Sequence, residues 1–225
     1  MKIVISGASG KTGYRVAEEA LKQGHEVKLL LRKNSILPKE LRKCEKEIIS
    51  LNNSLELDKS LINYDTLVIA TGARPSVDLT GPARVDALGV IRQIKSCQRV
   101  GLKRVILVSS LCAGKLLHPL NLFGLILIWK RIGETNLENS SLDWTIIRPG
   151  GLTEKESDIA DENVIYTAMN TQEEGSIPRR LVAKCCIEAM NTIESIGKIV
   201  EITSNKVSSK QTMKKAINSF PIPLS

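Results

Sequence analysis

The first thirty residues alternate between short apolar runs and a stretch with helical spacing. Lys2–Ser6 is a β-branched run, and Val27–Leu31 is a second continuous apolar run. Between them, Lys11–Gln23 carries apolar residues at the three- and four-residue spacing of a helix that faces a core, and Gly24 provides a helix stop. This order predicts a strand, a helix and a second, parallel strand, which together form a βαβ unit.

The alternation continues through the rest of the chain. Pro82–Val100 is the clearest interior helix. Five further strands are expected, at Glu47–Ser50, Thr66–Ala70, Arg104–Val108, Trp144–Ile147 and Ile199–Ile202. Strands that alternate with helices favour an α/β fold, a doubly wound parallel sheet of the Rossmann type with right-handed crossovers. The ligand crevice of such a sheet lies beyond the carboxyl ends of its strands.

The pattern changes after Pro149. Polar residues dominate 153–163, and helical spacing returns near Leu181–Asn191. A chain of 225 residues is within the size range of one α/β domain. We therefore predict a single Rossmann domain over 1–225, in which residues 151–225 form a small C-terminal, substrate-side capping region together with the final strand and helix.

A glycine-rich segment joins the first predicted strand to the first predicted helix. The first of its three glycines permits a tight turn, the second lets the backbone approach a pyrophosphate, and the third allows the helix to pack closely on the strand. The helix N-terminus adds oriented N–H groups for a phosphate. An ordinary glycine-rich turn is the less favoured alternative. The residues predicted to bind the phosphates are Gly7, Ser9, Gly10, Lys11, Thr12 and Gly13.

Arg32 and Lys33 follow the second predicted strand, about twenty residues beyond the glycines. Sites that select NAD carry an acidic residue here, which bonds the ribose 2′-hydroxyl, whereas a basic residue accommodates a 2′-phosphate. We therefore expect NADP (NADPH) as the cofactor, with Arg32 on its 2′-phosphate. The alternative for Arg32 is a solvated cation at a strand end.

Composition and charge limit the kinds of ligand, metal site and cellular location that the protein can be expected to have. The net charge is +8, but the basic residues are scattered and only 3% of residues are aromatic, so a solvated basic surface explains the charge better than nucleic-acid binding does. The five cysteines show no metal-binding spacing and the N-terminus lacks a signal-peptide pattern, which predicts reduced thiols, no metal site and a cytoplasmic protein. The longest apolar stretch, Leu120–Trp129, is too short to cross a bilayer as a helix.

Several motifs together resemble the atypical short-chain dehydrogenase/reductases. They are the GxxGxxG spacing, Leu29–Arg32, Val68–Ala73, Val108–Ser110 and Ile147–Leu152. The similarity covers most of the chain. Within that family the chain looks most similar to the NAD(P)H-binding group that includes biliverdin-IXβ/flavin reductases and the NADP-binding domains of chloroplast protein-import and photosystem-assembly proteins. This resemblance implies the fold and the cofactor inferred above.

The resemblance also implies cofactor contacts beyond the glycine-rich segment. It places the segment after the fourth strand beneath the cofactor, and a Pro-Gly-Gly loop beside the nicotinamide. An acidic residue that is often found near the adenine is replaced around Leu51–Asn52. The residues implied are Ala70, Thr71, Gly72, Ala73 and Arg74 in the first segment and Pro149, Gly150 and Gly151 in the loop.

Catalytic residues follow from the same resemblance. The family's active-site serine matches Ser110, with Ser109 as the second choice, and its hydroxyl would donate to the substrate or to the nicotinamide carboxamide. Many members carry Tyr-x-x-x-Lys, in which the tyrosine is a general acid. Lys130 matches the lysine, but Ile126 stands at the tyrosine position. We therefore expect Lys130 to keep only its role of binding the nicotinamide ribose.

Two functions fit these features. The first is an NADPH-dependent reductase that transfers hydride to a flat conjugated small molecule such as a flavin or a bilin, which takes its proton from solvent, so that the missing tyrosine is tolerated. The second is an NADP-binding redox-sensing assembly or docking factor with little catalytic activity. In that case Leu120–Trp129 would face a protein partner or a membrane surface, although a buried helix at the crevice wall is favoured for this stretch. A monomer or a small homo-oligomer without a transmembrane segment fits either function.

Overall fold

The computed structural model describes residues 1–73, 79–157 and 159–221. Within these residues, the centre is an eight-stranded sheet in the order β3-β2-β1-β4-β5-β6-β10-β8, and β7 pairs with β9 in a separate small sheet. Neighbouring strands are parallel except for β10 and β8, which are antiparallel. The strands are β1 (Lys2–Ser6), β2 (Glu26–Leu31), β3 (Glu45–Ile48), β4 (Thr66–Ile69), β5 (Arg104–Val108), β6 (Asp143–Pro149), β7 (Gly151–Thr153), β8 (Asn163–Ala168), β9 (Ser176–Pro178) and β10 (Lys198–Asn205).

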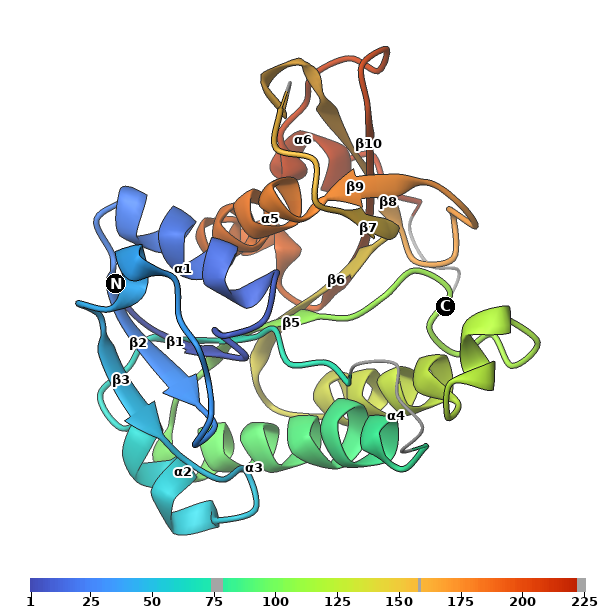
Figure 1. The fold of residues 1–225 in the computed structure, drawn as a ribbon. Helices are drawn as coiled ribbons and strands as arrows, with labels where there is room; N and C mark the ends of the chain where they lie inside the picture. The colour runs from blue at the N-terminus through green and yellow to red at the C-terminus, as the bar shows by residue number, and fades with distance from the viewer. Residues whose placement is uncertain (74–78, 158, 222–225) are drawn as a thin grey trace.

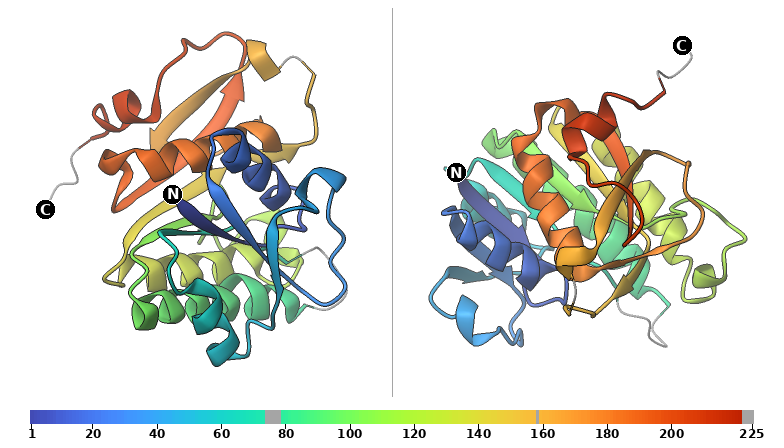
Figure 2. Two further views of the ribbon diagram at one scale, coloured as in Figure 1. Left: turned by 90° about the vertical axis from the view of Figure 1, so that its left-hand side faces the viewer. Right: turned by 90° about the horizontal axis from the view of Figure 1, so that it is seen from above.

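Helices cover both faces of this sheet, with α1 and α5 on one face and α2, α3 and α4 on the other (Figures 1 and 2). This arrangement is the doubly wound α/β fold that the sequence predicts. The helices are α1 (Gly13–Lys22), α2 (Ser54–Leu61), α3 (Val90–Val100), α4 (Ile126–Glu138), α5 (Arg179–Asn191) and α6 (Met213–Ile217), with the short helices η1 (Lys39–Leu41), η2 (Ala83–Gly89), η3 (Pro119–Leu122), η4 (Ile159–Asp161) and η5 (Ile193–Ser195). The π-helical segment η2 continues directly into α3, so the expected helix over Pro82–Val100 consists of these two parts.

The covered faces explain why the central strands are continuous apolar runs. Successive residues of a strand point to opposite faces, and both faces of this sheet are buried by helices. Ile3 and Ile5 of β1 pack in one core layer with Val16 of α1, whereas Val4 packs in the other layer with Leu57 of α2. The sheet therefore separates two hydrophobic cores.

The two edge strands differ most from the prediction. A strand was expected at Glu47–Ser50, whereas β3 occupies Glu45–Ile48, and the exposed side chains of Glu45 and Lys46 give it no hydrophobic signal. β8 lies beyond the predicted polar loops as an antiparallel edge strand, and most of its residues are only half-buried. An edge strand needs only partial burial, so hydrophobic pattern is a poor guide to it.

Residues 151–225 do more than cover the crevice. β10 lies between β6 and β8 in the main sheet, and α5 packs against α1. β7 and β9 pair in parallel just beyond the end of β6. The segment therefore contributes to the core as well as to the loops near the site, and its description as a cap stays a prediction.

The stretch Leu120–Trp129 is not the buried helix that was favoured for it. η3 ends at Leu122 and α4 begins only at Ile126, because Gly124 and Leu125 adopt positive φ values of 79° and 56° that interrupt a helix. Four apolar side chains of this stretch and two just before it are exposed, and Leu117 is 97% exposed. The six residues, which we call the apolar loop surface, are Leu116, Leu117, Leu120, Leu122, Phe123 and Leu125.

A buried group of charged side chains ties α4 to β6 and β10. Arg148 of β6, only 1% exposed, donates from Nε and Nη2 to the two carboxylate oxygens of Glu134 on α4, at 2.9 and 2.7 Å. Its Nη1 lies 3.5 Å from Glu201 Oε1 on β10. Glu201 also accepts from the backbone N–H groups of residues 170–172, at 2.7 to 2.9 Å. Because each buried charge has an opposite partner, the network can hold the loop before β9 against the sheet.

Candidate functional site

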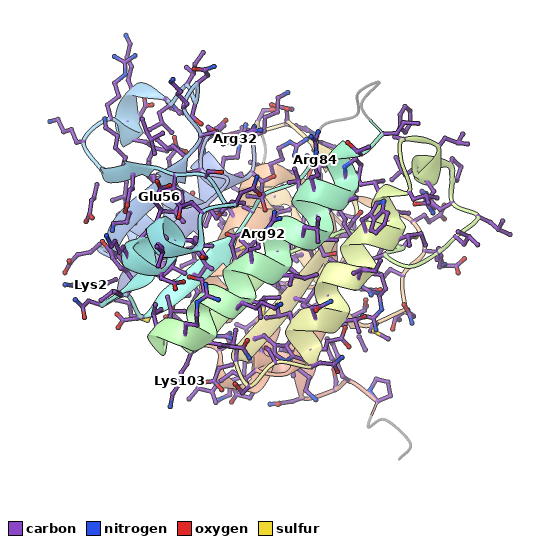
Figure 3. The ribbon with its side chains drawn as sticks, turned by 90° about the horizontal axis from the view of Figure 1, so that it is seen from below. Lys2, Arg32, Glu56, Arg84, Arg92 and Lys103 are labelled. Atoms are coloured by element: carbon purple, nitrogen blue, oxygen red, sulfur yellow. The ribbon has the colours of Figure 1, made fainter. Side chains whose placement is uncertain are left out.

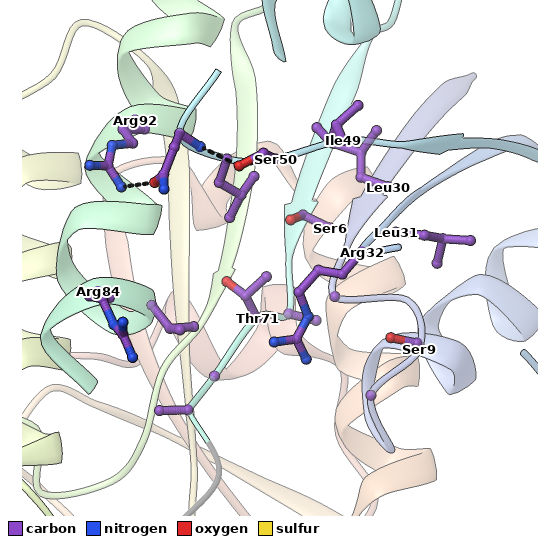
Figure 4. A pocket seen from close by; sticks show the side chains of 18 of the residues that line it. Ser6, Ser9, Leu30, Leu31, Arg32, Ile49, Ser50, Thr71, Arg84 and Arg92 are labelled. Atoms are coloured by element: carbon purple, nitrogen blue, oxygen red, sulfur yellow. Dashed lines mark hydrogen bonds between the residues drawn. The ribbon is translucent and has the colours of Figure 1, made fainter. Parts of the chain in front are cut away.

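A cleft of about 950 Å³ opens at the carboxyl ends of β1, β2, β3 and β4, where a doubly wound sheet binds its ligand. Figure 4 shows the glycine-rich loop on one side of this cleft and the helix that carries Arg84 on the other. Its volume is that of a large cofactor site. The predicted cofactor residues that line it are Gly7, Ser9, Gly10, Arg32, Ala70, Thr71, Gly72 and Ala73.

The three glycines make a backbone cradle that has no room for side chains. Gly7 has a φ of +83°, and a Cβ on it would lie 2.6 Å from the carbonyl oxygen of Ala70. A Cβ on Gly10 would lie 3.1 Å from the Gly7 carbonyl oxygen, and one on Gly13 would overlap that oxygen. The Gly10 N–H donates to the same oxygen at 2.8 Å. The turn therefore keeps the start of α1 open to a phosphate, so the residues present fit the predicted group.

Replacing Gly7 with alanine is expected to weaken nucleotide binding by about tenfold and to lower the free energy of unfolding by about 2 kcal/mol, because the new methyl group collides with the backbone after β4. Gly24 is the matched control, since it has a similar φ of +75° but a Cβ there meets nothing within 4 Å. Gly24→Ala should show only left-handed strain, about 1 kcal/mol, with unchanged binding. Calorimetry and thermal denaturation measure both effects, and equal losses in the two variants would contradict the steric explanation.

Three arginines line the cleft. Arg32 follows β2, Arg84 comes from η2 and Arg92 from α3, and Figure 4 shows Arg84 and Arg92 on the side of the cleft opposite Arg32. The Arg32 side chain projects into the cleft and forms no ion pair with a described residue. Arg92 Nη1 instead donates to Asn52 Oδ1 at 2.6 Å. The geometry thus leaves Arg32 available for an anionic group.

Lys11 and Thr12 contact residues from the C-terminal part of the chain. Lys11 forms an ion pair with Glu154, which follows β7, and its hydrogen bond lowers the pKa of that carboxyl group. Thr12 Oγ1 accepts from Arg179 Nη1 at 3.1 Å. The Thr12 hydroxyl can still donate its own hydrogen, whereas Lys11 would have to exchange Glu154 for a phosphate. Neither residue lines the cleft, so their roles as direct phosphate contacts stay predictions.

The loop after β4 and Lys130 meet at Asp86. The Lys130 ammonium on α4 lies 2.7 Å from Asp86 Oδ1, and the Ala73 N–H donates to Asp86 Oδ2 at 3.0 Å. Gly72 lies beside this pair, since a Cβ on it would be 3.7 Å from Asp86 Oδ1 and 3.9 Å from Lys130 Nζ. The structure thus brings the predicted ribose-binding lysine next to the predicted loop beneath the cofactor. Arg74, the remaining residue of that loop, lies outside the described residues.

Ser109 and Ser110 follow β5 but differ in burial. Ser109 is buried, and its Oγ has no hydrogen-bond partner among the described residues. It lines a small cavity together with Thr71, Asp86 and Lys130. Ser110 is half-exposed. Ser110 is thus the more exposed of the two hydroxyls, and its role as the active-site serine stays a prediction.

The predicted Pro-Gly-Gly loop is a short junction between two strands. Pro149 ends β6 and Gly151 begins β7, so Gly150 is the only residue between them. A Cβ on Gly150 would lie 2.6 Å from the Gly175 carbonyl oxygen, which shows that the loop before β9 packs directly on it. The Leu111 N–H donates to the Pro149 carbonyl oxygen at 2.8 Å. The junction therefore lies against the segment that follows Ser110.

The cysteines and the acidic residues suggest no other chemistry. Burial raises the pKa of Cys97 and of Cys185 to about 12, so both thiols stay protonated and poorly nucleophilic. In the part of the chain that the structure describes, no three metal-ligating side chains lie close enough together to hold an ion. A search of the same residues for a helix able to cross a membrane finds none.

Sequence reasoning did not select Asp86, Glu154 or Arg179. Asp86 had a usable signal, because it lies four residues before Val90 on the buried face of the predicted helix, and a buried carboxylate normally has a charged partner. Glu154 and Arg179 had no such signal in the sequence. They lie far along the chain from the glycine-rich loop, and only the packing of α5 and the end of β7 against α1 brings them to it.

Comparisons with known proteins show the family of the chain. Residues 7–192 match the model of a family described as NAD(P)H-binding. The chain is 34% identical to an uncharacterized chloroplastic protein of Arabidopsis thaliana, over 95% of this chain and 80% of that protein. It is 30% identical to the chloroplastic Protein TIC 62 of Pisum sativum, over 97% of this chain but only 46% of that protein. It is 29% identical to sanguinarine reductase of Eschscholzia californica, over 91% of this chain and 89% of that protein.

Solved structures show the same architecture. A Bacillus halodurans protein assigned to the NAD-dependent epimerases/dehydratases superposes with a TM-score of 0.83 and 27% identity, over 97% of this chain and 99% of that chain. An anaerobilin reductase from Escherichia coli O157:H7 superposes with a TM-score of 0.75 and 21% identity, over 93% of this chain and 100% of that chain. The second similarity shows the fold alone.

Proposed function

This chain belongs to the NAD(P)H-binding family, and from that premise we propose that it is an NADPH-dependent reductase whose acceptor is a flat conjugated molecule such as a flavin or a bilin. Membership confirms the resemblance drawn from the sequence motifs and an NAD(P)H-type cofactor. The choice of NADPH, the acceptor and the individual site residues belong to the proposal.

The observation that carries the proposal is the cleft with the glycine cradle at one side and Arg32 projecting into it, with no ion-pair partner for Arg32 among residues 1–73, 79–157 and 159–221. A guanidinium binds phosphate through two parallel hydrogen bonds and is therefore suited to a 2′-phosphate. A neutral ribose 2′-hydroxyl would form a much weaker interaction with the Arg32 guanidinium. Charge complementarity at this one position thus supports NADPH over NADH.

The proposed chemistry requires little from the protein besides orientation. Bound NADPH would supply a hydride to the acceptor, which takes a proton from solvent, so that NADP⁺ and the two-electron-reduced acceptor are the products. The glycine-rich turn would hold the phosphates and Lys130 the nicotinamide ribose. Ser110 would donate a hydrogen bond to the acceptor or the carboxamide. Since Ile126 replaces the usual tyrosine, no side chain is assigned as a general acid, and rate enhancement comes from proximity.

The similarity to sanguinarine reductase over most of both chains supports a reductase, because that protein carries the name of one.

The proposed function can be tested directly. NADPH and NADH are titrated into the protein by calorimetry, and the nicotinamide absorbance is then followed with FMN, FAD or biliverdin. We expect tighter binding of NADPH and its oxidation by at least one acceptor. Binding without oxidation would contradict the reductase assignment, and no binding of either nucleotide would contradict the cofactor.

A second function is favoured by a different observation, the apolar loop surface. Its exposed leucines and Phe123 lie in the segment that precedes α4, and exposed apolar patches often mark contacts with partners. The similarity to TIC 62 covers only 46% of that protein, so a role in assembly comes from analogy. Under this alternative the protein is an NADP-binding docking factor, which binds NADPH but does not oxidise it with any of the three acceptors.

Three further expectations stay predictions. The oligomeric state is expected to be a monomer or a small homo-oligomer, and residues 1–225 are expected to form one domain. The cytoplasmic location is not confirmed, because several named relatives are chloroplastic. The five cysteines are free, as the predicted reduced thiols require.

A further inference from the structure

Asp86 is a buried carboxylate at the centre of the candidate site. It lies in η2, and its side chain is 1% exposed. Its two oxygens have different partners: Oδ1 lies 2.7 Å from Lys130 Nζ, and Oδ2 accepts from the Ala73 N–H at 3.0 Å. One side chain therefore contacts both the loop after β4 and the lysine of α4.

The backbone around Asp86 keeps these partners at fixed distances. Gly133 of α4 packs against η2 so closely that a Cβ on it would lie 2.5 Å from the Asp86 carbonyl oxygen. Lys130 lies on the same helix, less than one turn earlier. The spacing between α4 and η2 is thus set by backbone contact. The carboxylate of Asp86 then only has to orient the lysine side chain.

A lysine side chain needs such a partner to hold one position. Its ammonium is a strongly hydrated charge on a flexible four-carbon stem. Here the Lys130 side chain is only 14% exposed, so much of its hydration is lost and the Asp86 carboxylate compensates for it. The side chain of Ile126, on the preceding turn of the helix, cannot accept a hydrogen bond, so it offers the Lys130 ammonium no alternative partner.

Two more polar atoms lie at the same place. Thr71 Oγ1 and Ser109 Oγ are buried, have no hydrogen-bond partner among the described residues, and belong to residues that line one small cavity with Asp86 and Lys130. Polar groups from η2, from α4 and from the segments after β4 and β5 thus converge beside Gly72. This is where the proposed function puts the nicotinamide ribose.

We propose that Asp86 is a positioning residue for the nicotinamide half of the cofactor: it holds the Lys130 ammonium toward the ribose and clamps the backbone of Ala73 beneath it. The inference rests on the proposed function, because it takes NADPH as the ligand. It assigns Asp86 no contact with the cofactor itself. The adenosine half, at Arg32, should be independent of it.

The test separates the two halves of the cofactor. Asp86→Asn is titrated with NADPH and with adenosine 2′,5′-bisphosphate, which lacks the nicotinamide ribose. We expect the Kd for NADPH to rise by about tenfold or more, because a charge-assisted contact is lost, and the Kd for the bisphosphate to stay unchanged. Asp58→Asn is the matched control. It breaks a 2.7 Å ion pair with Arg99 on the α2–α3 surface and should change neither Kd.

Lys130→Met keeps the test decisive if Asp86→Asn does not fold. It should reproduce the selective loss of NADPH affinity, and adding Asp86→Asn to it should weaken NADPH by less than twofold more, because the carboxylate acts through the lysine. Unchanged NADPH affinity in these variants, or an equal loss for the bisphosphate, would overturn the inference. If the unmodified protein binds the bisphosphate but not NADPH, or neither, the proposed function fails instead.

Discussion

Replacing Arg32 with aspartate is expected to reverse the nucleotide preference, weakening NADPH by about 100-fold and leaving NADH the tighter ligand. The guanidinium supplies charge-assisted hydrogen bonds to a 2′-phosphate, each of which contributes about 1.5–3 kcal/mol. An aspartate removes these bonds and repels the phosphate, but its carboxylate can accept a hydrogen bond from the 2′-hydroxyl of NADH. Calorimetric Kd values for both nucleotides measure the change.

The control must show that the effect is local, since the protein has a net charge of +8 and any charge reversal reduces its attraction for anions. Lys103→Asp makes the same change in charge at an exposed position before β5, and Figure 3 shows Lys103 far from Arg32. We expect less than a threefold effect there. Similar losses in the two variants would mean that Arg32 is only a solvated cation, which is the alternative drawn from the sequence.

Replacing Arg148 with methionine is expected to lower the free energy of unfolding by about 3–5 kcal/mol, because the buried carboxylates of Glu134 and Glu201 both lose their buried cation. Glu134 would keep only a 3.2 Å contact with the partly exposed Arg131. For a protein of this size, such a loss corresponds to a decrease in the thermal midpoint on the order of 10 °C. Glu201 would keep its three backbone N–H donors. Glu134 would lose its bidentate partner and be the main source of the loss.

The matched control is Lys115→Met, which removes a cation from an exposed ion pair with Glu173, close to the same loop. Exposed pairs contribute little, so its midpoint should stay the same. A second variant tests the cause directly. In Arg148→Met with Glu134→Gln, one of the uncompensated charges is gone, and part of the stability should return. A double variant that is no more stable than Arg148→Met alone would show that packing, rather than charge, explains the loss.

The sequence by itself determined the fold class and the glycine-rich turn, because both depend on local chemistry. The strands of a doubly wound sheet are buried on both faces, so β1 reads as an unbroken apolar run. Gly7 and Gly13 are required by a turn that spans only a few residues. The position of Arg32 follows from the length of one βαβ unit. The bounds of the edge strand β3 and the presence of the edge strand β8 escaped prediction, because partial burial leaves a weak hydrophobic pattern.

Only the tertiary structure decided how side chains from distant segments pair. It joined Asp86 to Lys130, Thr12 to Arg179, and Arg148 to both Glu134 and Glu201. These partners lie between 14 and 167 residues apart in sequence. Strand order and helix packing set these contacts, and a single sequence carries no pattern that pairs one buried charge with another. The cradle for phosphate could therefore be predicted from the sequence, whereas the residues that hold the lysine beside it could not.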